Sequence, residues 1–145
     1  MKRLSYLAWA AACTLFALTG CRSTAIKPSL ASPVPTALVS APIVPQGETS
    51  SLVTFTRDSG GTPHTRWIIY FDSQPAVHIG KGETVTMQLP SGQHILGIEP
   101  DAKIKVLQIT NVSQDLVAGH HYFFRAMFTG QDYRLQQTGS SGDVR

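Results

Sequence analysis

The chain has 145 residues, with 12 lysines and arginines against nine aspartates and glutamates, and a formal net charge of +3. Two of the basic residues, Lys2 and Arg3, open the chain, and the others are scattered singly. Nucleic-acid binding requires basic residues that cluster on one face, so this composition excludes that class and we expect no nucleic-acid partner.

An apolar run follows the basic start. Residues 7–18 are apolar except for Thr14. A helix that spans a membrane needs about 20 apolar residues, which is longer than this run. A basic start, a short apolar run and then small residues are typical of a secretory signal peptide. Residues 1–20 are therefore predicted to be a signal peptide that the mature protein lacks.

The predicted signal peptide ends in Leu18-Thr19-Gly20-Cys21, which resembles the lipobox of bacterial lipoproteins. The resemblance implies cleavage after Gly20, a diacylglycerol on the thiol of Cys21 and an acyl group on the new amino terminus. Two or more acyl chains hold a protein stably at a membrane, whereas one binds reversibly. Because Arg22 follows the cysteine, the resemblance also implies an outer-membrane protein that faces the periplasm, with the inner membrane as the alternative.

The segment after the cysteine has a different composition. Residues 22–50 hold five of the nine prolines, with alanine, serine and threonine between them. Proline removes the backbone donors that regular structure needs. Residues 21–50 are therefore predicted to be the lipidated cysteine and a linker, which would hold the domain about 30 Å from the membrane as a flexible coil.

From residue 51 the pattern changes to the alternation of apolar and polar residues that is typical of β-strands. Residues 83–89 alternate most clearly, and residues 66–72 are apolar on both faces, as in a central strand. We expect strands at 51–57, 66–72, 76–79, 83–89, 93–98, 103–110, 112–117, 120–128 and 132–138. No helix is expected after residue 50, and residues 139–145 are predicted to be a disordered tail. Regularly spaced short strands predict an all-β sandwich over residues 51–138.

Since Cys13 would leave with the signal peptide and Cys21 would carry lipid, this domain has no disulfide and depends on an apolar core. Four of its segments resemble PEGA-like domains and their uncharacterised lipoprotein relatives: LVTFTR, WIIYFD, LPSGQHILGI (89–98) and LVAGHHYFFRA (116–126). The resemblance implies a small immunoglobulin/PEGA-like β-sandwich of about seven to nine strands. It departs at Asp72-Ser73-Gln74, where the relatives commonly have Asp-Gly. Members of this kind are mostly envelope lipoproteins without an assigned function.

The sequence offers no catalytic constellation. It lacks the G-x-S-x-G elbow of hydrolases, and its carboxylates are dispersed. His120 and His121 are adjacent, so on a regular strand they point to opposite faces. His78 and His94 are weak metal-ligand candidates that could be brought together across strands, with Asp72 or Glu99 nearby. We expect no enzyme, no catalytic residue and no cofactor other than the lipid; a small metal-dependent periplasmic enzyme or metal-binding protein is the alternative.

Aromatic and long side chains are abundant on two of the expected strands. Trp67 and Tyr70 lie on one, and Phe123, Arg125 and Met127 share one face of the other. Each sheet of a two-layer sandwich turns one face to solvent, so this surplus is either core or an exposed surface for a partner. We interpret the protein as a non-catalytic binding or structural module of the cell envelope, whose expected partner is an envelope protein or a glycan.

Overall fold

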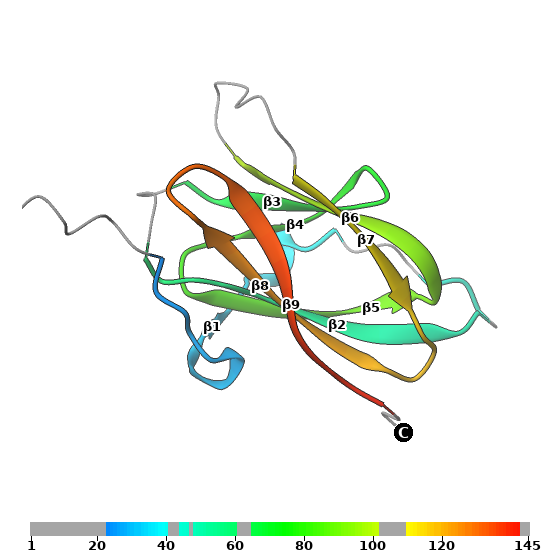
Figure 1. Ribbon diagram of the computed structural model, residues 1–145. Helices are drawn as coiled ribbons and strands as arrows, with labels where there is room; N and C mark the ends of the chain where they lie inside the picture. Colours follow the sequence, from blue (N-terminus) through cyan, green and yellow to red (C-terminus); the bar gives the residue numbers. More distant parts are fainter. Residues whose placement is uncertain (1–22, 41–43, 47, 61–64, 102–109, 143–145) are drawn as a thin grey trace, which may run out of the picture.

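The structure is a computed structural model that describes residues 23–40, 44–46, 48–60, 65–101 and 110–142. Within these ranges nine strands form two sheets that pack face to face (Figure 1). This all-β sandwich confirms the predicted fold class. Among the described residues, no helix has the length and apolar character that a membrane crossing would require.

Sheet A contains five strands and sheet B contains four. In spatial order, sheet A is β1 (Ser32–Pro33), β5 (Glu83–Pro90), β2 (Ser50–Arg57), β8 (His121–Phe128) and β9 (Tyr133–Ser141). Sheet B is β4 (Gln74–Ile79), β3 (Trp67–Phe71), β6 (Gly92–Pro100) and β7 (Thr110–Leu116). Most neighbouring strands are antiparallel, but β2 runs parallel to β8 and β1 runs parallel to β5.

The apolar core lies between the two sheets. On β2, Val53 and Phe55 are fully buried, and the ring of Phe55 stacks on that of Phe124 from β8. On β5, Met87 and Leu89 point inward while Thr86 and Gln88 are exposed, as the alternation predicts. The expected central strand is confirmed, because β3 lies between β4 and β6.

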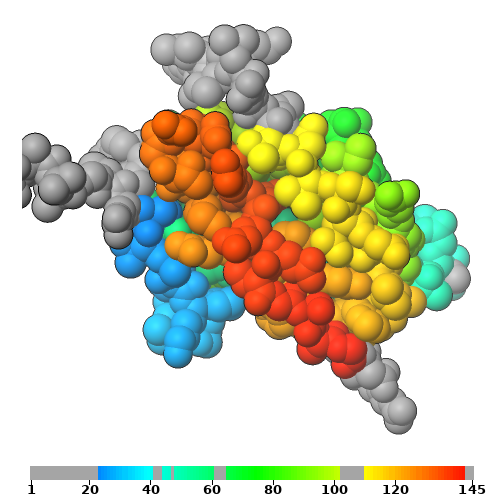
Figure 2. All heavy atoms as spheres, in the orientation of Figure 1, coloured from blue at the N-terminus to red at the C-terminus, as the bar shows by residue number. Residues whose placement is uncertain are grey.

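The predicted linker is wrong for residues 23–40. This segment contains the 3-10 turns η1 (Pro28–Leu30) and η2 (Thr36–Leu38) with β1 between them. Val34 is buried in the core, and Val39 forms a bridge with Val77 of β4. We call residues 23–39 the N-terminal arm; it is blue in Figures 1 and 2 and lies against the domain.

The proline content led to the wrong prediction of a linker, because Pro33 occupies a position where the strand needs no backbone N–H donor. Ser32 and Val34 donate their backbone N–H groups to the carbonyls of Gly82 and Thr84, both over 3.0 Å. Along a strand, only every second residue forms hydrogen bonds with a given neighbouring strand. Pro33 lies between the two residues that bond to this neighbour, so its missing N–H costs no hydrogen bond to β5. A short strand with a proline also covers the edge of sheet A at β5.

The predicted disordered tail is also wrong in part. β9 continues to Ser141, and Gly139, Ser140 and Ser141 pair with Phe123, Tyr122 and His121 of β8. These small polar residues are held by backbone pairing with a neighbouring strand, for which side-chain hydrophobicity gives no signal. The strand predicted at 103–110 lies outside the described residues except for Thr110, which begins β7.

The two ends of the sandwich differ in what they carry. At one end β2 finishes at Arg57 and β5 begins at Glu83; we call it the arm end, because the N-terminal arm joins the domain there. At the opposite end β2 begins at Ser50 and β7 finishes at Leu116; we call it the far end.

Candidate functional site

The outer face of sheet A presents rows of polar side chains that the strand register sets side by side. Thr54 of β2 lies between Thr86 of β5 and Phe123 of β8, and its hydroxyl is 2.6 Å from that of Thr86 and 2.7 Å from Nε2 of His121. In the next row the hydroxyls of Thr56 and Thr84 are 2.9 Å apart. These mutual hydrogen bonds order the face, and Thr54 and Thr56 are themselves buried, each only 4% exposed.

A partly buried ion pair lies at the arm end of this face. The carboxylate of Asp58, which is 1% exposed, accepts hydrogen bonds from Nε and Nη2 of Arg125, both over 2.7 Å. A bidentate pair of this kind combines two charge-assisted hydrogen bonds. The same carboxylate raises the pKa of Arg125 above its ordinary value, so Arg125 stays charged.

The arm is attached to the domain at the same carboxylate. The hydroxyl of Ser23 donates a hydrogen bond to Asp58, and the backbone N–H of Ser59 donates to the carbonyl of Thr24 over 3.0 Å. The first residues that the structure describes are therefore fixed to the loop that follows β2. Asp58 links the two parts, because it binds Arg125 of β8 and Ser23 of the arm.

A groove of about 460 Å³ runs between the arm and the outer face of sheet A. Residues 25–28 of the arm form one wall, and Phe123, Arg125 and Thr138 contribute to the other. The ring of Phe123 stacks on that of His121 with 4.2 Å between the ring centroids. With Ala25 and Ile26 opposite this ring, the lining is largely apolar; its charged members are Lys27 and the paired Arg125.

The structure brings three of the five predicted partner residues together. Phe123, Arg125 and Met127 alternate with the buried Tyr122, Phe124 and Ala126 on β8, so they lie on the outer face of sheet A. Tyr70 lies on the outer face of sheet B, where its hydroxyl donates to Glu99. Burial and that hydrogen bond raise the pKa of Tyr70 to about 12.

Trp67, which the sequence leaves open between the core and an exposed surface, belongs to the core. Trp67 is fully buried, and its ring meets that of Tyr133 edge-on with 5.1 Å between the centroids. Sequence reasoning missed Arg57, whose guanidinium carbon lies 3.8 Å from the centre of the Trp67 ring. Arg57 is fully buried, and this burial lowers its pKa to about 10. Nη1 of Arg57 donates to the carbonyls of Thr65 and Ile79 over 2.6 and 3.1 Å.

The two metal-ligand candidates do not share a site. His78 pairs with Ile68 near the start of β3. His94 lies on β6 before Leu96, the partner of Phe71, and is therefore at the far end of the sandwich. Each has its own carboxylate: Nδ1 of His78 is 3.0 Å from Asp101, and Nδ1 of His94 is 2.7 Å from Asp72. No group of three or more potential metal ligands occurs in the described part of the chain.

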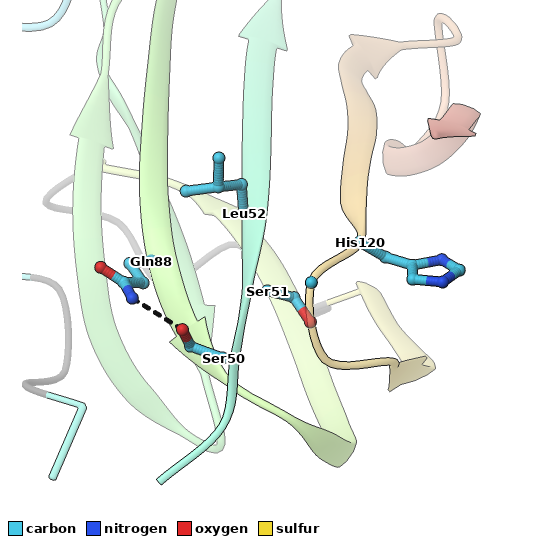
Figure 3. A pocket seen from close by; sticks show the side chains of 6 residues that line it. Ser50, Ser51, Leu52, Gln88 and His120 are labelled. Carbon is cyan, nitrogen blue, oxygen red and sulfur yellow. Dashed lines mark hydrogen bonds between the residues drawn. The ribbon is translucent and has the colours of Figure 1, made fainter. Parts of the chain in front are cut away.

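A second, smaller depression of about 210 Å³ lies at the far end, between Ser50, Ser51, Leu52, Gln88 and His120 (Figure 3). Its amide and hydroxyl groups are already bonded: Nε2 of Gln88 donates to Ser50 over 2.6 Å, and Ser51 donates to the carbonyl of Val117 over 2.6 Å. Figure 3 shows the ring of His120 pointing away from this pair. The depression therefore has no base positioned against a nucleophile.

The predicted lipid attachment residue, Cys21, and the motif residues Leu18, Thr19 and Gly20 lie outside the described residues. Comparison of the chain with protein-family models, with curated proteins and with solved structures finds no match. The PEGA-like resemblance and the lipobox therefore stay predictions.

Proposed function

We propose that this protein is a lipid-anchored lipoprotein of the cell envelope whose β-sandwich serves as a non-catalytic binding or structural module on the periplasmic side of the outer membrane. The observation that carries the proposal is the sequence Leu18-Thr19-Gly20-Cys21 directly after a short apolar run. The covalent lipid on Cys21 is the one prosthetic group that the proposal requires, and the membrane is its first partner.

The outer face of sheet A supports the binding role. Phe123 and Met127 are only partly buried there, and the groove beside Phe123 is apolar enough to receive a side chain or a sugar face. Apart from Lys27, the charged and hydroxyl side chains that line the groove have partners within the domain, which suits a surface that recognises shape more than one that performs a reaction. The expected second partner is an envelope protein or a glycan.

The anchor is tested by metabolic labelling of cells with a radioactive or clickable palmitate. The wild-type chain is expected to incorporate the label, and Cys21→Ser is expected to lose it entirely. Cys13→Ser is the matched control, because Cys13 lies in the predicted signal peptide and its loss should leave labelling unchanged. Labelling that survives in Cys21→Ser would overturn the proposed anchor.

The binding surface is tested by photo-crosslinking in cells that produce the full chain. A photoreactive amino acid at Phe123 is expected to capture one dominant envelope component. The same amino acid at Tyr70 is the control, because that side chain lies on the outer face of the opposite sheet. Equal capture at both positions, or capture at neither position from a folded and anchored chain, would count against this surface.

A further inference from the structure

The N-terminal arm displays the most exposed large apolar side chain in the described part of the chain. Leu30, the last residue of η1, is 73% exposed, compared with 49% for Ile95 and 47% for Val117. The turn is closed by a hydrogen bond of 2.9 Å from the N–H of Leu30 to the carbonyl of Lys27. A short closed turn therefore holds Leu30 in solvent, and the arm forms a ridge at the side of the molecule (Figure 2).

Uncompensated positive charge lies close to this leucine. Lys27 and Lys81 are exposed, and neither forms an ion pair with another described residue. The turn that contains Lys81 lies beside the arm, because Ser32 donates to the carbonyl of Gly82 over 3.0 Å.

Each described carboxylate at this end has a partner; that of Asp101, on the side of sheet B, lies 3.0 Å from Nδ1 of His78. Asp58 is paired with Arg125 over 2.7 Å, Glu83 with Arg66 over 2.8 Å and Asp132 with Arg134 over 3.3 Å. The arm end therefore offers two free ammonium groups and an exposed leucine on neighbouring turns. An apolar side chain flanked by lysines is the combination that binds the interface of a bilayer containing anionic lipids.

The position of the proposed anchor brings the same end to the membrane. Ser23 is fixed to Asp58, and Cys21 precedes Ser23 by two residues, which span at most about 7 Å when fully extended. An acylated Cys21 would therefore hold the arm end of the sandwich at the lipid headgroups. The domain would therefore lie close to the membrane and not at the end of the long tether that the proline content predicts.

We infer that the N-terminal arm and the Lys81 turn form a membrane-contact surface, on which Leu30 enters the acyl-chain boundary while Lys27 and Lys81 contact lipid phosphates. The inference rests on the proposed lipid anchor. It orients the whole domain: the arm end lies on the bilayer, and the far end, with Ser50, Gln88 and His120, points away from it.

The test uses the mature lipidated chain, which has no free thiol once Cys21 carries lipid. An environment-sensitive fluorophore is attached to Leu30→Cys or, as the matched control, to Val117→Cys, since Val117 is an exposed apolar residue at the far end. Each protein is reconstituted into vesicles of phosphatidylethanolamine and phosphatidylglycerol that contain a phospholipid with a nitroxide on its acyl chain. At position 30 we expect a blue-shifted emission and a loss of fluorescence through quenching by the nitroxide. At position 117 we expect the emission seen in water and no loss.

A second variant tests the charges. Lys27→Glu with Lys81→Glu, in the background labelled at position 30, is expected to reduce the quenching in the same vesicles, with an unchanged circular-dichroism spectrum. The intact mass of the protein shows whether Cys21 is acylated, and so it distinguishes a failure of the proposed anchor from a failure of the membrane-contact surface. A chain without acyl mass on Cys21 overturns both. An acylated chain with position 30 unquenched, or with position 117 quenched as strongly, overturns the membrane-contact surface alone.

Discussion

Asp58 is the single residue that joins three parts of the molecule: the end of β2, Arg125 of β8 and Ser23 of the arm. Its side chain is buried, so its charge is compensated by those partners and hardly by water. Loss of this one charge should therefore loosen both the sheet and the arm.

We expect Asp58→Asn to lower the free energy of unfolding by about 1–3 kcal/mol, because a neutral amide cannot replace the charge-assisted bonds from Arg125. Denaturant unfolding of the soluble form without the signal peptide measures the change. The matched control is Asp132→Asn, which breaks the exposed pair with Arg134 and should cost no more than about 0.5 kcal/mol. Equal effects of the two substitutions would contradict the role assigned to Asp58.

Glu83 makes stability depend on pH in the acid range. Burial by itself raises the pKa of Glu83, but hydrogen bonds from Arg66 and from the N–H of Gly80 outweigh it, so the pKa lies below its ordinary value of 4.5. A carboxyl whose folded pKa is depressed stabilises the fold above its unfolded pKa, and this contribution is lost as the pH falls through the folded pKa.

We therefore expect Glu83→Gln to be less stable than the wild type at neutral pH and to lose less stability on acidification below about pH 4.5. Denaturant unfolding at neutral and acid pH measures both. If the two proteins lost stability in parallel, the carboxylate of Glu83 would contribute nothing to the acid response.

At the scale of elements, β1 and the arm form part of the sandwich. Val34 is 8% exposed and contributes to the same core as β2 and β5, and β1 covers the edge of β5. We expect Val34→Ala to lower the free energy of unfolding by about 1–2 kcal/mol through the lost methyl groups and the space they leave. Val117→Ala, at an exposed position, should change it by less than about 0.5 kcal/mol.

Hydrogen exchange supplies an independent reading of the same element. The N–H groups of Ser32 and Val34 should exchange slowly, because they are bonded to Gly82 and Thr84. Exchange as fast as in an unfolded peptide would mean that the arm does not lie on the domain in solution.

For the whole molecule, the proposed orientation at the membrane depends on the short connection between Cys21 and Ser23. We expect that inserting a flexible glycine–serine segment between Arg22 and Ser23 leaves the fold and the acylation intact. It should weaken the contact of Leu30 with lipid, because a longer tether lowers the effective concentration of the arm at the bilayer. The nitroxide quenching of a label at position 30 measures this loss. Undiminished quenching would show that the arm binds lipid without help from the anchor.

Several parts of the fold were predictable from residue patterns. The alternation on β5 and β8 identified which side chains point inward, because burial of one face of a sheet requires a period of two. On β2 the inward Val53 and Phe55 were identified, but Thr54 and Thr56 on the other face are buried as well. The split of β8 into an inner face with Phe124 and an outer face with Phe123 followed from the same rule. Trp67 could not be assigned in this way, because β3 is apolar on both faces and either could have met solvent.

The candidate site was predictable only in part. Phe123, Arg125 and Met127 were found because they share one face of one strand. Arg57 and Asp58 were missed, since a charged residue at the end of a strand usually faces solvent and only the three-dimensional packing buries this pair of neighbours. The arm was missed because its contacts with β5 and Asp58 link residues far apart in the chain.

Local composition and period were sufficient to predict the all-β class and the inward faces of the strands, and the proposed attachment point at Cys21 rests on the same kind of local pattern. Tertiary structure alone decided the parallel pairing of β2 with β8, the docking of the arm and the position of β9 up to Ser141. Those features depend on backbone hydrogen bonds and on pairs of distant residues such as Ser23 with Asp58, whose energies arise only once the chain has brought them together.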